Sequence, residues 1–209
     1  MSKTGYLILM VIIIFSYKPL ENIFKKLFNK SINYQLWESK GYYAWGLILL
    51  IIYLVVNPID YIVKVPVNNK WGIMAILYVG ISTIFTCIYN INIYYPRKSN
   101  KFRCFHYGVI QPIFEEVAFR GLILPMTVYI LGDHAEAIIL LNGIIFMAFH
   151  LNYWSFNKEN VSMFFSFLII GVYFSYIALI TQSIIYPILC HIIINGGNTL
   201  YRNLKYECR

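Results

Sequence analysis

The sequence predicts an all-α membrane protein, a polytopic bundle of about seven transmembrane helices with one further amphipathic helix at the membrane interface. Hydrophobic residues make up 59% of the 209 residues and charged residues only 12%, against about 45–50% and 25% in soluble domains. Apolar stretches near the ~20 residues that cross a bilayer recur along the chain. We therefore expect a single membrane domain over residues 1–209. Its N-terminal helices lie in 1–107, and a helical core that contains polar residues lies in 108–200.

The apolar runs between polar loops locate the predicted helices. Their ranges are 5–17, 42–59, 71–95, 108–131, 134–151, 161–180 and 183–200. The first range is short and resembles a signal peptide, but the sequence at its end, Ser16-Tyr17-Lys18-Pro19, offers no small-residue cleavage site. We expect this segment to remain in the protein as an anchor.

The segment between the first two predicted spans has the pattern of a helix lying on the membrane. Apolar residues recur there at helical spacing, and the lysines fall mostly on the opposite side. The apolar positions are Leu20, Ile23, Phe24, Leu27 and Phe28, and the basic ones are Lys25, Lys26 and Lys30. A solvated connector is the alternative interpretation of this segment.

The net charge of +8 comes from basic residues spread over short loops, so a membrane explains it better than nucleic acid. The loops at 18–40, 97–103 and 152–160 and the segment 202–209 hold most of the lysines and arginines. Because positive loops stay in the cytoplasm, we expect an integral protein of the cytoplasmic membrane with its N-terminus outside and its C-terminus inside. Membrane lipid is then a partner, and nucleic acid is not.

Five polar residues within the apolar runs are the candidates for chemistry. Glu115 and Glu116 are adjacent in the fourth predicted span, His150 ends the fifth, and His191 and Asn195 lie one turn apart in the seventh. Ionisable groups inside a membrane are costly and usually functional. With the predicted orientation and the rise of about 1.5 Å per residue, these groups share the cytoplasmic half of the membrane. We expect them to line one cavity.

The two glutamates are expected to have different roles. Glu116 and Arg120 stand four apart, in the order that favours an ion pair. Glu115 has no cation three or four residues away, so we assign it as the general base and Glu116 and Arg120 as supporting residues. The alternative is that both acids serve only helix packing.

The remaining residues allow two chemistries. His191 and Asn195 can donate hydrogen bonds to an oxyanion, whereas Glu115, His150 and His191 could together bind a divalent metal such as zinc. The usual H-E-x-x-H signature is absent, and the residues alone leave this choice open. The histidines His106 and His134 are interpreted as interfacial. Three amides, Asn142, Gln182 and Asn198, are interpreted as hydrogen-bond partners between helices.

Three motifs resemble those of the CAAX protease and bacteriocin-processing family of intramembrane endopeptidases, also called the CPBP or Abi family. They are Pro112-x-x-Glu115-Glu116-Val117-Ala118-Phe119-Arg120-Gly121, Phe146-x-x-x-His150 and His191-x-x-x-Asn195, in this order and each on its own apolar run. The resemblance covers residues 108–200. It implies a catalytic helical core in which Glu115 activates water with His150 as its partner, and His191 with Asn195 binds the oxyanion.

The same resemblance implies a range of activities. Family members cleave prenylated proteins near a CAAX box, or act in bacteriocin maturation, self-immunity or signalling; some are classed as metalloproteases, although a metal-free glutamate mechanism is also favoured. The composition suggests a bacterial source, so we expect processing of a membrane-associated peptide or protein. A non-catalytic scaffold that regulates a sensor kinase or toxin is the alternative, and a transporter is less favoured because the halves show no inverted repeat.

Overall fold

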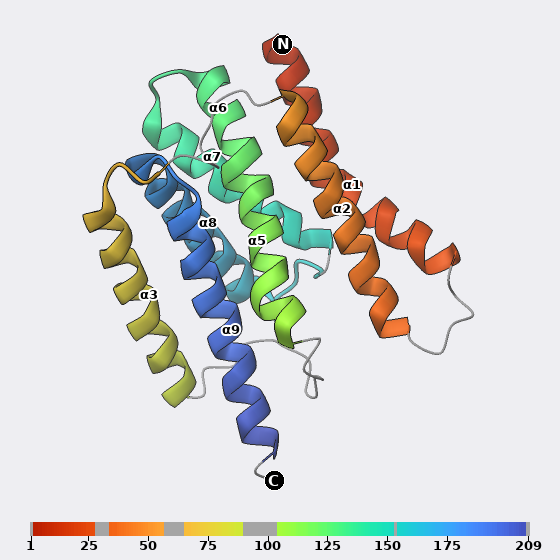
Figure 1. Ribbon diagram of the computed structural model, residues 1–209, viewed down its shortest axis with the longest axis vertical. Helices are drawn as coiled ribbons and strands as arrows, with labels where there is room; N and C mark the ends of the chain where they lie inside the picture. Colours follow the sequence, from red (N-terminus) through yellow and green to blue (C-terminus); the bar gives the residue numbers. More distant parts are fainter. Residues whose placement is uncertain (1, 28–33, 57–64, 90–103, 153, 208–209) are drawn as a thin grey trace. The chain divides into compact units, whose positions relative to one another are not determined.

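The computed structural model describes residues 2–27, 34–56, 65–89, 104–152 and 154–207. Within these ranges every regular element is a helix, as the composition predicts (Figure 1). The elements are α1 (Lys3–Leu27), α2 (Tyr34–Val56), α3 (Asn69–Ile88), η1 (His106–Ile110), α5 (Gln111–Glu116), η2 (Val117–Ile123), α6 (Leu124–Leu131), α7 (Ala135–Phe149), η3 (His150–Asn152), α8 (Val161–Thr181) and α9 (Ile185–Glu207).

Helices occur at all seven places where the apolar runs predict them, so the prediction of a helical membrane bundle is confirmed. The predicted surface helix is not a separate element. It is the last part of α1, which runs through Pro19 to Leu27, and Figure 1 shows the axis of α1 changing direction along its length. A proline inside a helix removes one backbone hydrogen bond and bends the axis. Phe28 and Lys30 lie outside the described residues.

Four helical stretches are long and apolar enough to cross a membrane. They are Lys3–Ile23, Asn69–Ile88, Ala135–Asn152 and Val161–Thr181, and the apolar part of α2, Gly41–Val56, is shorter. The other two predicted spans are the ones that carry the polar candidates: α9, and the helical run 104–131, which is divided among η1, α5, η2 and α6. The chain is therefore an integral membrane protein. Most of the polar candidates lie on α9 and on the helical run 104–131, which are not among the four long apolar stretches.

The chain folds into two compact units that alternate along the sequence. The first unit consists of Met1–Tyr61 and Val117–Tyr176, and the second of Ile62–Glu116 and Ile177–Arg209. The chain passes between them three times, between Tyr61 and Ile62, between Glu116 and Val117, and within α8 between Tyr176 and Ile177. The predicted division of the helices at residue 108 differs from the boundaries of these units, and it stays a prediction.

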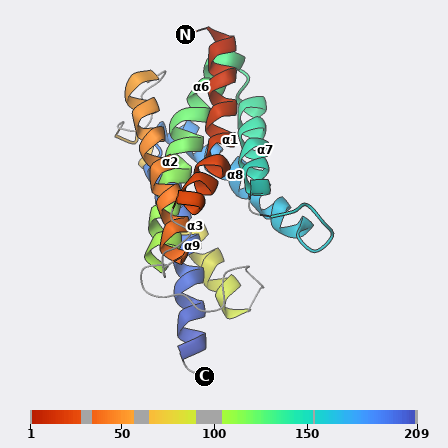
Figure 2. The ribbon, with the colours of Figure 1, turned by 90° about the vertical axis from the view of Figure 1, so that its right-hand side faces the viewer.

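The first unit has an aromatic core. Helix α1 packs against α2 and α6, and α6 packs against α7. The Trp45 ring stacks on Phe149 with 5.4 Å between centroids, and its indole nitrogen donates to Ser16 Oγ at 3.1 Å. Helices α7 and α8 approach closely because both contact positions are glycines: a Cβ on Gly171 would lie 2.9 Å from the Cα of Gly143. Figure 2 shows the loop that joins the end of α7 to α8.

The second unit is built around α9. Helix α3 packs along α9, and η1 and α5 pack against it as well (Figure 1). At one end Tyr186 donates its hydroxyl to Asn69 Oδ1 at 2.8 Å, with its ring over Gly72. Further along α9, a Cβ on Gly108 of η1 would lie 3.1 Å from the Cα of Gly196. Gly108 and Gly196 let η1 and α9 lie backbone to backbone, and Gly72 leaves room on α3 for the Tyr186 ring.

Wider π-helical turns precede two of the prolines. The π-helical segment η1 ends at Ile110, and Pro112 is the second residue of α5; η2 ends at Ile123, and Pro125 is the second residue of α6. Such turns are common at functional sites and, like proline, interrupt the regular hydrogen-bond ladder of a helix. Pro187, by contrast, lies in the first turn of α9, where its missing N–H leaves no gap in the ladder.

Two glycines of α3 give a matched test of this packing. A Cβ on Gly72 would lie 2.2 Å from the Tyr186 ring, whereas a Cβ on Gly80 meets nothing within 4 Å. We expect Gly72→Ala to lower the free energy of unfolding by about 1–3 kcal/mol through overpacking, and Gly80→Ala to leave it equal or raise it by up to about 1 kcal/mol through helix propensity. Unfolding in detergent micelles measures both, and equal stability of the two variants would contradict the packing.

Candidate functional site

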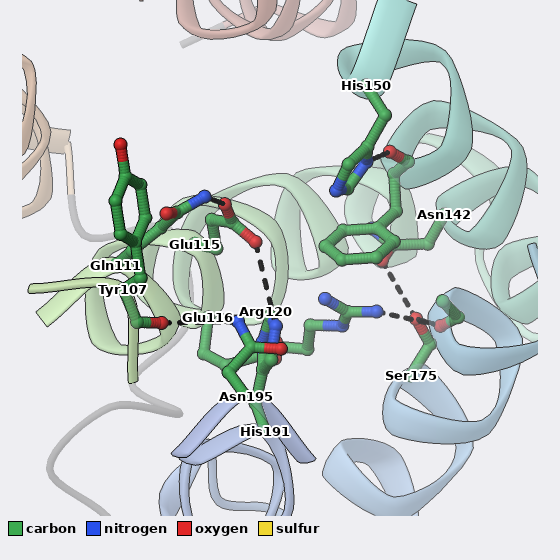
Figure 3. Close-up of polar contacts among 12 residues, drawn as sticks. Tyr107, Gln111, Glu115, Glu116, Arg120, Asn142, His150, Ser175, His191 and Asn195 are labelled. Atoms are coloured by element: carbon green, nitrogen blue, oxygen red, sulfur yellow. Dashed lines mark hydrogen bonds and ion pairs between the residues drawn. The ribbon is translucent and has the colours of Figure 1, made fainter. Parts of the chain in front are cut away.

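The two adjacent glutamates lie at the end of α5, in the second unit. Both are buried, with exposed fractions of 1% for Glu115 and 0% for Glu116. Helix α5 packs against α9, and α9 carries His191 and Asn195 on one face because the two residues are one turn apart. The fold therefore gathers four of the predicted residues in one place, as Figure 3 shows.

His191 contacts both carboxylates through its two ring nitrogens (Figure 3). Its Nδ1 lies 2.7 Å from Glu116 Oε1, and its Nε2 lies 3.7 Å from Glu115 Oε2. The first distance is that of a hydrogen bond, in which the ring donates to the carboxylate when Nδ1 carries the proton. The second is an electrostatic contact beyond hydrogen-bond length. Glu116 thus fixes the direction of the ring, and Nε2 is the nitrogen turned toward Glu115.

The other oxygen of Glu115 has a different partner. Gln111, one turn earlier on the same helix, donates from Nε2 to Glu115 Oε1 at 2.7 Å. The prediction for Glu115 concerned cations three or four residues away and not this neutral donor. The signal was present, because a glutamine four residues before a carboxylate is a recognised helical pair.

Asn195 is held by the backbone of the π-helical turn. Its Nδ2 donates to the carbonyl oxygen of Tyr107 at 3.5 Å. In a π-helix that carbonyl would accept from the N–H five residues later, but this residue is Pro112, which has none. The Gln111 N–H bonds instead to the carbonyl of His106. Because Pro112 has no N–H to donate, the Tyr107 carbonyl can accept the hydrogen bond from Asn195, which joins α9 to η1.

Arg120 lies in the first unit, fully buried at 0% exposure. Its Nη2 donates to the carbonyl of Gly171 at 2.9 Å, and its guanidinium carbon lies 4.5 Å from the centroid of the Phe146 ring, a distance typical of a cation–π contact. The predicted pairing of Arg120 with Glu116 involves residues of both units and stays a prediction.

A small polar network surrounds Arg120 within the same unit. Ser175 Oγ lies 2.7 Å from the Gly171 carbonyl and 2.8 Å from Asn142 Oδ1, and Asn142 Nδ2 donates to the Phe119 carbonyl at 3.2 Å. Asn142 thus links α7 to α8 and to η2. This confirms its interpretation as a hydrogen-bond partner between helices.

His150 also belongs to the first unit, at the point where α7 gives way to the 3-10 turn η3. Its backbone N–H bonds to Met147 and Ala148 rather than to Phe146 four residues earlier. The Phe146 carbonyl lies instead 2.8 Å from the ring Nδ1, so Nδ1–H donates to it and a neutral ring carries its lone pair on Nε2. The imidazole stacks on Phe167 with 3.8 Å between centroids. Ring orientation and tautomer are therefore both set.

His106 is buried at the start of η1, with 3% of its surface exposed. Its interpretation as an interfacial residue concerns its depth in the membrane and stays a prediction.

Glu115, His150 and His191 are the expected ligands of a metal ion, and this ligand set stays a prediction. Among the described residues no three His, Cys, Asp or Glu side chains are grouped so as to bind one ion, but Glu115 and His191 belong to the second unit and His150 to the first. Nδ1 of His191 lies 2.7 Å from Glu116 Oε1, and a histidine that binds a metal through Nε2 commonly donates its Nδ1–H to a carboxylate in this way.

Comparison with protein families gives one match. Residues 98–197 match the model of the family described as Type II CAAX prenyl endopeptidase Rce1-like, a stretch just under half of the chain. It contains the glutamates, His150, His191 and Asn195, and it agrees with the resemblance found in the three motifs. No curated protein and no solved structure matches the chain significantly.

The contact between Glu116 and His191 predicts strong coupling in a double-mutant cycle. Either Glu116→Leu or His191→Leu leaves the other buried polar group without this partner, whereas the double variant removes both. We expect a coupling energy of about 1–3 kcal/mol in detergent-based unfolding. As a control, His191→Leu combined with Glu159→Leu, which changes an exposed acid, should be additive. Additivity in both cycles would contradict the contact.

Proposed function

We propose that the chain is a member of the family whose model matches residues 98–197, described as Type II CAAX prenyl endopeptidase Rce1-like, and that it is an intramembrane endopeptidase that uses Glu115 to activate water. The observation that carries this proposal is the buried carboxylate of Glu115 facing His191 Nε2 at 3.7 Å. Polar contacts in apo enzymes are often long and tighten only when substrate binds. A carboxylate and an imidazole side by side, away from bulk water, supply a base and a hydrogen-bond donor to one reacting group.

The proposed reaction proceeds in two proton transfers. Glu115 takes a proton from a water molecule, with His150 as its partner, while the water oxygen attacks the carbonyl carbon of the peptide bond. His191 and Asn195 donate hydrogen bonds to the resulting oxyanion. When the tetrahedral intermediate collapses, the C–N bond breaks and Glu115 returns the proton to the leaving amine. Water is consumed, and a carboxylic acid and an amine are released.

Glu116 supports this reaction through His191. A hydrogen bond from Nδ1–H to a carboxylate stabilises a positively charged ring, so Nε2 can also carry a proton. That proton would be the donor to the oxyanion. We propose a structural role for Arg120, the last charged residue of the first motif. It stabilises the helix that carries this motif by its hydrogen bond to the Gly171 carbonyl and its contact with the Phe146 ring.

The proposed substrate is a peptide or protein held at the membrane. The family description names prenyl CAAX substrates, and a lipid-anchored segment presents its backbone at the depth of a buried site. In a bacterial setting, which the composition suggests, this means processing of a small peptide or bacteriocin, or self-immunity against one. Membrane lipid is the expected surrounding partner.

The proposed orientation places the N-terminus outside and the 154–160 loop in the cytoplasm. In a chain whose own cysteines are replaced by serine, we expect Ser2→Cys and Asp133→Cys to react with a membrane-impermeant maleimide in intact cells. Asn157→Cys, which is exposed in its loop, should react only after permeabilisation. The reverse pattern would overturn the orientation that follows from the positive loops.

Replacing Glu115 tests the peptidase assignment. We expect Glu115→Gln to lower kcat by about 10²–10⁴-fold, because the amide cannot accept the proton of water. The assay follows cleavage of a fluorogenic farnesylated peptide ending in a CAAX box, and of candidate leader peptides, by purified protein in lipid nanodiscs. The control is Glu136→Gln, the same change at an exposed acid, which should leave kcat within about twofold.

Three outcomes would change the proposal. Loss of wild-type activity in a zinc chelator, restored by added zinc, would favour Glu115, His150 and His191 as metal ligands. Equal activity of wild type and Glu115→Gln would remove Glu115 from the reaction. A cellular phenotype that survives both Glu115→Gln and His150→Ala would favour a non-catalytic scaffold regulating a sensor kinase or toxin. The hydrogen-bonded network of Asn142, Ser175 and Gly171 is the observation that favours that alternative.

A further inference from the structure

We infer that Gln111 is a positioning residue for the reaction, which holds the Glu115 carboxylate so that one oxygen is fixed and the other faces the reacting groups. This inference rests on the proposed function of Glu115. It concerns a residue outside the three motifs that carry the family resemblance.

The two oxygens of Glu115 have different surroundings. Oε1 accepts a hydrogen bond from Gln111 Nε2 at 2.7 Å, and Oε2 lies 3.7 Å from His191 Nε2. A carboxylate whose Oε1 accepts this hydrogen bond cannot exchange its two oxygens by rotation without breaking the bond. Gln111 thus makes Oε2 the oxygen directed toward His191.

The position of Gln111 follows from the local backbone. It is the first residue of α5, directly after the π-helical segment η1, and its own N–H bonds to the His106 carbonyl five residues earlier. From there α5 is regular, so Gln111 and Glu115 stand four apart on one face. Gln111 is half-buried and Glu115 is buried, so the amide lies on the outer side of the carboxylate.

Burial decides how much this hydrogen bond matters. On an exposed helix a pair of this kind stabilises by only a few tenths of a kcal/mol. Away from water, a hydrogen bond to an ionised group is worth considerably more, because the acceptor cannot replace its lost partner with solvent. Loss of the donor should therefore affect the carboxylate more than it affects the helix.

A series of variants at Gln111 separates positioning from folding. Gln111→Met keeps the length and removes the donor, Gln111→Lys keeps a donor, and Gln111→Glu adds a like charge. We expect kcat to fall about 10-fold or more in Gln111→Met, as loss of a charge-assisted hydrogen bond implies, with KM within about threefold. The order of kcat should be wild type, then Lys, then Met, then Glu. The midpoint of thermal unfolding should be similar in the Met and Lys variants.

An infrared measurement gives a readout that does not need catalysis. The carboxylate stretching band that disappears in Glu115→Gln identifies Glu115, and this band should shift in Gln111→Met but less in Gln111→Lys. If Glu115→Gln is inactive while Gln111→Met keeps wild-type kcat, the inference is wrong and the proposed function stands. If Glu115→Gln is fully active, the proposed function fails. In that case an unshifted band in Gln111→Met overturns the hydrogen bond as well.

Discussion

The hydrogen bond between His191 and Glu116 is the interaction on which the site depends. A carboxylate and an imidazole buried in a helical membrane protein each carry a high desolvation cost, which only a close polar partner offsets. Bonding at 2.7 Å gives each group a close polar partner and directs the remaining ring nitrogen at Glu115. The glycine contacts of α9 with η1 and α3 allow the helices to come close enough for this bond. The close packing of helices around α9 therefore supports both the stability of the second unit and the geometry of its candidate site.

Interruptions of regular helix recur beside the polar residues of both units. After η1, Pro112 lacks the N–H that would donate to the Tyr107 carbonyl. The Asn195 side chain donates to that carbonyl instead. At the end of α7, the change to a 3-10 turn directs the backbone N–H of His150 away from the Phe146 carbonyl. The His150 imidazole donates to that carbonyl instead. Inside a membrane protein a backbone carbonyl needs an internal donor. A broken helix can thus anchor a side chain as well as bend.

The sequence predicted the helices well and the contacts less well. Apolar runs near the length of a bilayer predict helix positions better than helix ends. Helix α8 matches its predicted range 161–180 closely, whereas α2 begins at Tyr34 rather than at 42, α9 ends at Glu207 rather than at 200, and α1 continues through Pro19. The structure brings Glu115 and His191 together, and the shared depth of Glu115, His150, His191 and Asn195 stays a prediction. The contact between Glu116 and His191 joins residues 75 apart in sequence, and no local spacing rule reveals it. Gln111 was missed because only cations were sought.

The most direct test of the account is the protonation of His191, measured by nitrogen-15 NMR of histidine-labelled protein, with the signal assigned through His191→Gln. We predict that Nδ1, which lies 2.7 Å from Glu116 Oε1, carries a proton and that its signal changes in Glu116→Leu while the signal of His150 does not. A neutral His191 with its proton on Nε2 and an unprotonated Nδ1, or a signal indifferent to Glu116, would contradict it.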